Sequence, residues 1–299
     1  MEEYISEIRN YLPLNYRDSE NNEYVKYLID ACQETSSLNK DQFSLIAFHM
    51  LYMSYIFKVI WQSHKTNHGN IHNHLQNHLN QLGNYENPFD LSIVKEEEAI
   101  KILRCFGFHM NRINQFQIPI KNRDHCAHAS GFIQYKKPDV EQVVKDELSH
   151  VKAIQEKTKE LLAQLFMNYF TTYYKPDDVN SFFPSGLDSV DKFIQQHLLS
   201  IKDLEAICEI EFGFMRMESS TAEIIWRKVF YLLTVAKRDE LIGNDYKYFI
   251  DKFSLILNGI FYQTEISVDD LLENEFSVIW QTLTTEQKTI MLGVNNVRQ

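Results

Sequence analysis

The chain has 299 residues, of which 44% are hydrophobic and 24% charged, as is typical of a globular protein. Its formal net charge of −11 argues against a general nucleic-acid coat protein, because neutralising phosphates requires a basic surface. Only nine glycines and six prolines are present, and neither G-x-G-x-x-G nor G-x-x-x-x-G-K-[ST] occurs, so Rossmann and P-loop folds have no motif support.

The first half of the chain predicts helices near residues 2–11 and 23–33 and a long helix over 40–64. The longest apolar run, Leu45 to Trp61, is interrupted by His49, Ser54 and Lys58. A run this short and this polar predicts a buried core helix and not a membrane span. The four cysteines are isolated from one another, and no signal peptide is evident, so we expect reduced thiols in a cytoplasmic protein without a membrane partner.

Residues 63–84 are rich in histidine and asparagine. Spacings of four place some of these histidines on one helical face, which is a geometry that binds zinc or nickel. A solvated, amide-rich loop is the favoured interpretation, and we expect no metal and no cofactor. The histidines are His64, His68, His72, His74 and His78.

Further along, the pattern predicts a helix over 91–108, a loop over 111–122, a helix from Asp124 to about Tyr135 and a long helix over 140–170. The acidic run Glu96-Glu97-Glu98 reads as a solvated helix start. Residues 174–186 contain two prolines and two aspartates and mark a domain boundary. Helices are then expected over 187–200, 201–216, 220–241, 245–262 and 267–283.

These elements predict an all-α protein with weak strand signals throughout. The organisation that follows is a helical extension over 1–39, a helical domain over 40–174 and a C-terminal helical domain of unknown role over 187–299.

The most informative motif is Arg123-Asp124-His125-Cys126-Ala127-His128. Asp124 and His128 are four residues apart and share a face if the segment is helical. Asp124 is also a good N-cap residue, which would bring Arg123, Asp124 and His128 together at a helix N-terminus, a place that suits a phosphate. Residues 101–137 hold seven basic residues against one acidic residue. The expected RNA contacts are Arg112, Lys121, His125, Lys136 and Lys137.

Spacing alone does not make this motif specific, since Arg104 and His109 stand the same distance apart. We reject that pair because its intervening residues are apolar and it resembles the end of a helix, where the dipole repels phosphate. A purely structural interpretation of the main motif stays open: Asp124 caps a helix, Arg123 pairs with a carboxylate, and His128 is packed or exposed.

With its helix order, the Arg-Asp-x-x-Ala-His motif resembles the HEPN superfamily over residues 40–172. The resemblance implies an all-helical, metal-independent endoribonuclease of toxin or antiviral-defence type that acts on RNA as a homodimer, with an antitoxin or regulatory protein as a possible partner. It implies that His128 is the general base or acid for attack by the RNA 2′-OH, that Arg123 binds the scissile phosphate, and that Asp124 orients one of them.

Two other functions stay open. One is a non-catalytic helical module that binds RNA or a protein partner with the same fold. The other is a metal-binding regulator that uses the histidine-rich segment.

Overall fold

The computed structural model describes residues 1–66, 86–128, 135–173 and 193–208, and within these ranges the chain is helical with no β-strand. One isolated bridge pairs Pro13 with Ser200. The all-α prediction is therefore confirmed for the described part of the chain. Residues 1–167 and 195–207 form one compact unit, and every contact discussed below lies within it.

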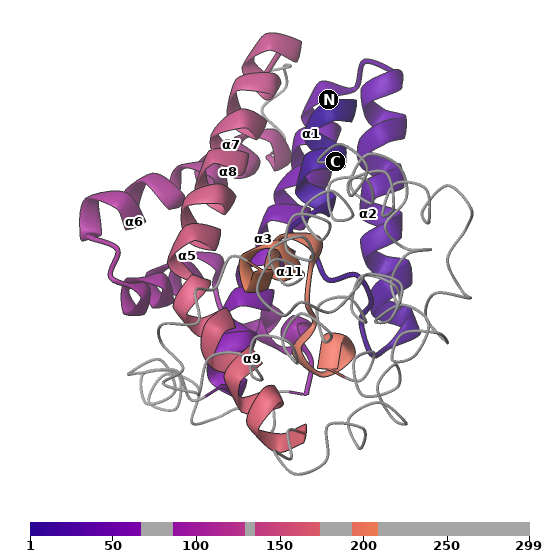
Figure 1. Ribbon diagram of the computed structural model, residues 1–299. Helices are drawn as coiled ribbons and strands as arrows, with labels where there is room; N and C mark the ends of the chain where they lie inside the picture. The colour runs from indigo at the N-terminus through magenta and orange to yellow at the C-terminus, as the bar shows by residue number, and fades with distance from the viewer. Residues whose placement is uncertain (67–85, 129–134, 174–192, 209–299) are drawn as a thin grey trace, which may run out of the picture. The chain divides into compact units, whose positions relative to one another are not determined.

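The centre of this unit is helix α3 (Asp41–Lys65), which is covered along most of its length (Figure 1). Its apolar side chains include Phe48, Tyr52, Tyr55 and Ile56, all completely buried. The helix is long and apolar enough to cross a membrane by length and composition, but 83% of that apolar window is buried inside the protein. The prediction of a buried core helix is confirmed. The helices packed on it are α2 (Ser19–Ser37), η1 (Pro88–Ile93), α5 (Glu96–Ile102), α7 (Ile118–Ala127) and α8 (Lys137–Lys157).

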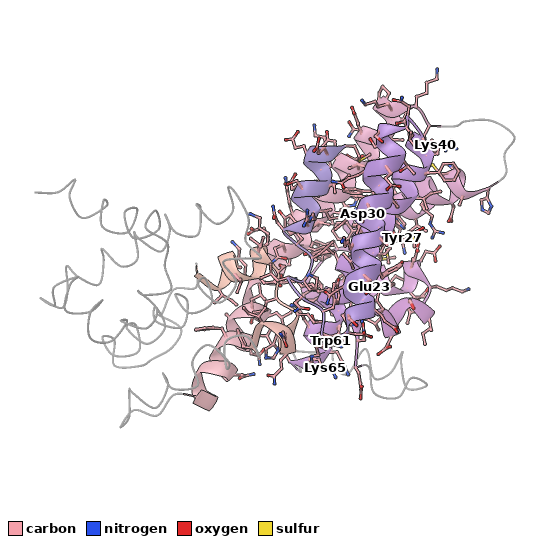
Figure 2. The ribbon with its side chains drawn as sticks, turned by 90° about the vertical axis from the view of Figure 1, so that its right-hand side faces the viewer. Glu23, Tyr27, Asp30, Lys40, Trp61 and Lys65 are labelled. Atoms are coloured by element: carbon pink, nitrogen blue, oxygen red, sulfur yellow. The ribbon has the colours of Figure 1, made fainter. Side chains whose placement is uncertain are left out.

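The N-terminal helices α1 (Glu2–Arg9) and α2 belong to the same core. The Asp18 side chain caps α2 by accepting a hydrogen bond from the backbone N–H of Glu20. The inner face of α2 packs on α3, whereas Glu23, Tyr27 and Asp30 follow its outer face (Figure 2). The predicted extension over 1–39 is thus an integral layer of the fold.

The middle of the chain differs from the prediction in its helix boundaries. The expected helix over 91–108 is divided into η1, α5 and the short 3₁₀ helix η2 (Leu103–Phe106), which ends at Gly107 with φ of 80°. The expected loop over 111–122 contains nearly all of α6 (Met110–Phe116) and the first half of α7. Pro119 lies in the first turn of α7, where a missing N–H costs nothing, so this proline begins a helix that the sequence pattern had treated as broken.

The predicted helix over 140–170 is also two helices, α8 and α9 (Lys159–Tyr173), separated at Thr158. Helix α11 (Ile201–Cys208) lies in the last described range, residues 193–208. The predicted boundary over 174–186, the histidines at 68–78 and the helices expected after residue 208 lie outside the described residues.

A buried ion pair holds α11 and the residues just before it against α3. Lys58 Nζ contacts Asp203 Oδ2, and both side chains are at most 1% exposed. Asp203 also accepts hydrogen bonds from Gln155 (2.8 Å) and Gln62 (3.3 Å). Residues 195–207 therefore belong to the first unit, although the sequence pattern assigns them to a C-terminal domain beginning at residue 187.

Candidate functional site

The Arg-Asp-x-x-Ala-His motif lies at the C-terminal end of α7. The helix ends at Ala127, and His128 is its C-cap residue, with its backbone N–H bonded to the carbonyl of Asp124 at 3.0 Å. The predicted helix start at Asp124 is wrong. Asp124 belongs to the last turn, so neither its capping role nor an anion site at a helix N-terminus applies to this motif.

The Arg123 side chain is tied to two carboxylates. Its Nη2 donates to Glu96 Oε2, and its Nη1 contacts Asp124 Oδ1 at 3.1 Å. The Arg123 side chain is 27% exposed, whereas its Nε is buried and has no hydrogen-bond partner among the described residues. Arg123 is therefore fixed at the edge of the core with part of its surface facing solvent.

Behind Glu96 lies a buried histidine that sequence reasoning missed as a site residue. His49 Nε2 is 3.3 Å from Glu96 Oε2, the same oxygen that contacts Arg123, and His49 Nδ1 is 2.7 Å from Glu147 Oε1. The result is a chain of contacts from α8 through α3 and α5 to α7. We call Glu147, His49, Glu96 and Arg123 the charge relay; it joins a fully buried carboxylate to a surface guanidinium.

With both carboxylates ionised, the geometry requires His49 to carry a charge. A neutral imidazole can donate from only one nitrogen, but both nitrogens of His49 face carboxylate oxygens, so the imidazolium is the form that satisfies both contacts. Burial by itself lowers the pKa of His49, but the hydrogen bonds and charges of Glu147 and Glu96 outweigh it and raise that pKa to about 9.

The two carboxylates of the relay differ in environment. Burial raises the pKa of Glu147 above its usual range, with the hydrogen bond from His49 opposing it. Burial also raises the pKa of Glu96, but His49 and Arg123 together bring it below the usual value. Glu147 Oε2 is buried and has no hydrogen-bond partner among the described residues.

Most of the predicted RNA-binding residues lie near the end of α7 and the start of α8. Tyr135, just before α8, links this segment to α7, because its hydroxyl is 3.2 Å from Asn122 Oδ1. Its backbone N–H also donates to Gln42 of α3 at 3.1 Å. The predicted RNA contacts exposed here are Lys121, His125, Lys136 and Lys137, and the predicted catalytic residue His128 is exposed as well.

Arg112, the other predicted RNA contact, belongs to a different environment. Its guanidinium lies over the Phe116 ring at 5.1 Å, and Nη1 donates to Gln115 at 2.7 Å. The Phe116 ring in turn contacts the His150 ring, with 4.9 Å between centroids. Burial, assisted by the charge of Arg112, lowers the pKa of His150 to about 4. Burial, with a smaller contribution from Arg112, thus keeps His150 neutral.

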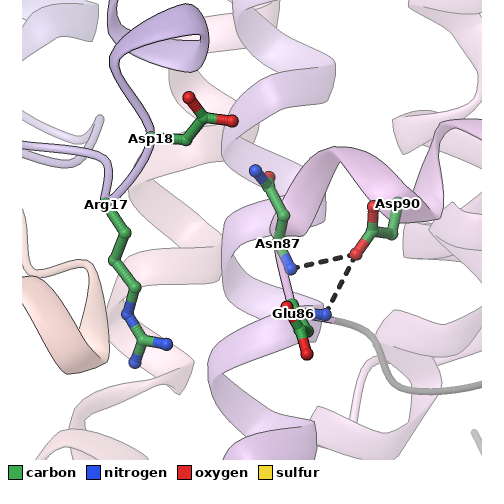
Figure 3. A pocket seen from close by; sticks show the side chains of 5 residues that line it. All are labelled: Arg17, Asp18, Glu86, Asn87 and Asp90. Atoms are coloured by element: carbon green, nitrogen blue, oxygen red, sulfur yellow. Dashed lines mark hydrogen bonds between the residues drawn. The ribbon is translucent and has the colours of Figure 1, made fainter.

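A separate pocket of about 500 Å³ is lined by Arg17, Asp18, Glu86, Asn87 and Asp90 (Figure 3). Its polar groups mainly hold the local fold. Asp90 Oδ2 accepts the backbone N–H groups of Glu86 and Asn87, both at 3.0 Å, and Arg17 donates to the carbonyls of residues 195 and 196. We assign no chemistry to this pocket.

Metal chemistry has no support in the described residues, where no group of three or more His, Cys, Asp or Glu side chains is arranged to hold an ion. The carboxylates that flank His49 bind opposite nitrogens of its ring and so do not converge on one point. Of the histidine-rich segment only His64 is described.

Two signals in the sequence pointed toward the relay. His49 interrupts an apolar run, and Glu96 opens an acidic run that we interpreted as a solvated helix start; Glu96 instead faces His49 and Arg123. Nothing in the sequence links Glu147 to either of them. The chain matches no protein-family model, no curated protein and no solved structure.

Proposed function

We propose that this protein is a metal-independent endoribonuclease whose reacting groups are Arg123 and His128, in the manner of the HEPN superfamily that its motif resembles. The observation that carries the proposal is the fixed, partly exposed Arg123 side chain on the same helix end as an exposed histidine; its positive charge must outweigh the helix dipole, which disfavours phosphate at this end. Such a pair supplies the two things that cleavage by a 2′-OH needs, a cation for the phosphate and a group that transfers protons near neutral pH.

Each motif residue has a distinct role in the proposed reaction. Arg123 holds the scissile phosphate and stabilises the charge that grows on it, while Asp124 holds Arg123 from the side opposite Glu96. His128 removes the proton from the 2′-OH or protonates the leaving 5′ oxygen. One histidine performs one of these tasks, so a second copy of the chain is proposed to bring the other. The exposed lysines near the motif, Lys121, Lys136 and Lys137, contact the RNA backbone.

The test is cleavage of total cellular RNA and tRNA by the purified protein in EDTA. Discrete fragments with 2′,3′-cyclic phosphate and 5′-OH ends are expected from the wild type. The Arg123→Ala and His128→Ala variants should lose roughly 10²- to 10⁴-fold in rate. The matched control is the double variant Arg104→Ala with His109→Ala, which removes an exposed pair of the same spacing and should cleave like the wild type.

A non-catalytic RNA- or partner-binding module is the second candidate. It is favoured by one observation: both terminal nitrogens of Arg123 contact carboxylates, so the guanidinium is already paired. This module would bind RNA in a gel-shift assay without cleaving it. Neither the wild type nor Arg123→Ala would then yield cleavage products. Cleavage that persists in both motif variants would remove the ribonuclease assignment from this motif.

A further inference from the structure

We propose that Glu96 is the positioning residue for Arg123 and that His49, clamped between Glu96 and Glu147, keeps Glu96 in place. The catalytic meaning of this inference rests on the proposed function, but its structural part does not. Neither Glu96, His49 nor Glu147 belongs to the motif, and each comes from a different helix.

One carboxylate oxygen of Glu96 contacts two cationic side chains. Glu96 Oε2 receives the contacts from both His49 Nε2 and Arg123 Nη2. A surface ion pair alone is worth little, because two long side chains must be held still in water. Here the carboxylate is fixed from its buried side by His49, which is only 1% exposed, so the guanidinium meets an acceptor that is already immobile.

The charges around His49 are balanced. The groups that face it are Glu96 from α5 and Glu147 from α8. Arg123 of α7 lies beyond Glu96, and Tyr52, one helical turn along α3, packs its ring 5.8 Å from the His49 ring. Two cations alternate with two anions along the relay, so the buried part needs no counter-ion from solvent. Removing His49 would leave Glu147, whose contact in the relay is His49 alone, buried and unpaired, which is strongly unfavourable.

Arg123 itself is held by two carboxylates. Its Nε is buried and has no hydrogen-bond partner within the described part of the chain, and its two Nη atoms contact Glu96 and Asp124. The remaining surface of the guanidinium is the part that a phosphate can reach. A loss of this alignment by about 1 Å is enough to cost roughly 100-fold in rate.

The test uses the full-length protein and two readouts. The first is the ¹⁵N relaxation of the Arg123 Nε–H signal, assigned by its disappearance in Arg123→Lys. We expect a rigid signal in the wild type and in Glu97→Gln, a matched change at the neighbouring exposed carboxylate, and a mobile one in Glu96→Gln. A mobile signal in the wild type, or a rigid one in Glu96→Gln, would overturn the structural claim whether or not the protein cleaves RNA.

The second readout is RNA cleavage. We expect Glu96→Gln to lower kcat by roughly 10- to 100-fold with little change in KM, because Arg123 acts in the transition state. Glu96→Asp should recover part of this loss. An unchanged kcat in Glu96→Gln beside an active wild type would overturn the positioning role. An inactive wild type would instead refute the proposed function and, with it, the catalytic meaning of the relay.

The contribution of His49 is tested by the double variant His49→Gln with Glu147→Gln, which removes both buried charges together and so avoids an unpaired carboxylate. We expect Arg123 to be more mobile than in the wild type and less mobile than in Glu96→Gln. Arg123 relaxation identical to the wild type would overturn the part assigned to His49. Melting temperatures of all variants separate loss of folding from loss of position.

Discussion

Replacement of Asp203 by asparagine is expected to be the most damaging single change of a polar residue in the described core. Lys58 is completely buried, and Asp203 is the carboxylate that balances its charge. In Asp203→Asn the ammonium loses its counter-charge, and its other hydrogen bonds among the described residues are to the neutral Ser200 hydroxyl at 3.3 Å and Tyr11 carbonyl at 3.4 Å. Breaking a buried ion pair on one side costs about 3–5 kcal/mol.

The opposite change should cost less. Lys58→Met removes the cation, but the Asp203 carboxylate still accepts from Gln155, Gln62 and the backbone N–H of Ser200. Loss of one charged hydrogen bond is worth about 2 kcal/mol. The double variant Lys58→Met with Asp203→Asn buries no charge, so its cost should be near that of Lys58→Met and well below the sum of the two single changes.

The assay is amide hydrogen exchange resolved by peptide, because the chain contains more than one unit and a single unfolding transition is not assured. Peptides from α3 and α11 report the opening free energy of the region that the pair holds together. Costs that add in the double variant, or an Asp203→Asn cost below about 1 kcal/mol, would refute the conclusion that this ion pair holds α11 in place.

Three further predictions follow from other buried groups. The His49 imidazole, titrated by NMR, should show a pKa of about 9. Its contribution to the stability of the fold is therefore complete below pH 6.5 and is lost as pH rises toward 9. An observed titration near 6.5 would contradict the relay geometry. His150, with a pKa of about 4, is buried in its neutral form, so the fold loses stability as pH falls from 6.5 to 4. In urea titrations His150→Phe should reduce this loss of stability at low pH. An unchanged loss would contradict the neutral burial of His150. Tyr55→Phe should cost about 1–2 kcal/mol in chemical denaturation, since its hydroxyl bonds Gln155 at 3.1 Å inside the core, and no measurable cost would exclude that bond.

The sequence pattern predicts the central helix well because burial leaves a regular trace. The apolar positions of α3 recur at helical spacing, and its bounds agree with the prediction to within one residue. The three residues that interrupt the run are explained only by the structure. His49 and Lys58 are buried cations with carboxylate partners, and Ser54 donates to the carbonyl of Met50 at 2.7 Å.

The prediction failed where one residue type has two opposite structural meanings. A proline in the interior of a helix breaks the helix, whereas a proline in the first turn is favourable. Pro119 lies in the first turn of α7. That single reversal moved the expected helix by several residues and placed Asp124 at the wrong end of it. The structure pairs Arg123 with Asp124 and joins His128 to Asp124 through the backbone, and the field around these residues is that of a helix C-terminus.

The partners of the charged residues were not predictable from local pattern. His49 meets a carboxylate 98 positions away, and Arg123 meets one 27 positions away. Neither spacing corresponds to a helical or strand period, so only the packing of four helices brings these groups together. The sequence supports the presence of a motif, and the structure supplies the groups that hold its arginine.

The pairing of Lys58 with Asp203 also has a consequence for the order in which the protein is made. The two residues are 145 positions apart, so a ribosome adding about 5–20 residues per second needs roughly 7–30 s to supply the carboxylate after the lysine. During that interval α3, the most apolar of the described helices, exists with the Lys58 cation lacking its carboxylate partner. A nascent chain that ends before Asp203 is therefore expected to remain open and accessible to chaperones, and closure of the core is a late event in synthesis.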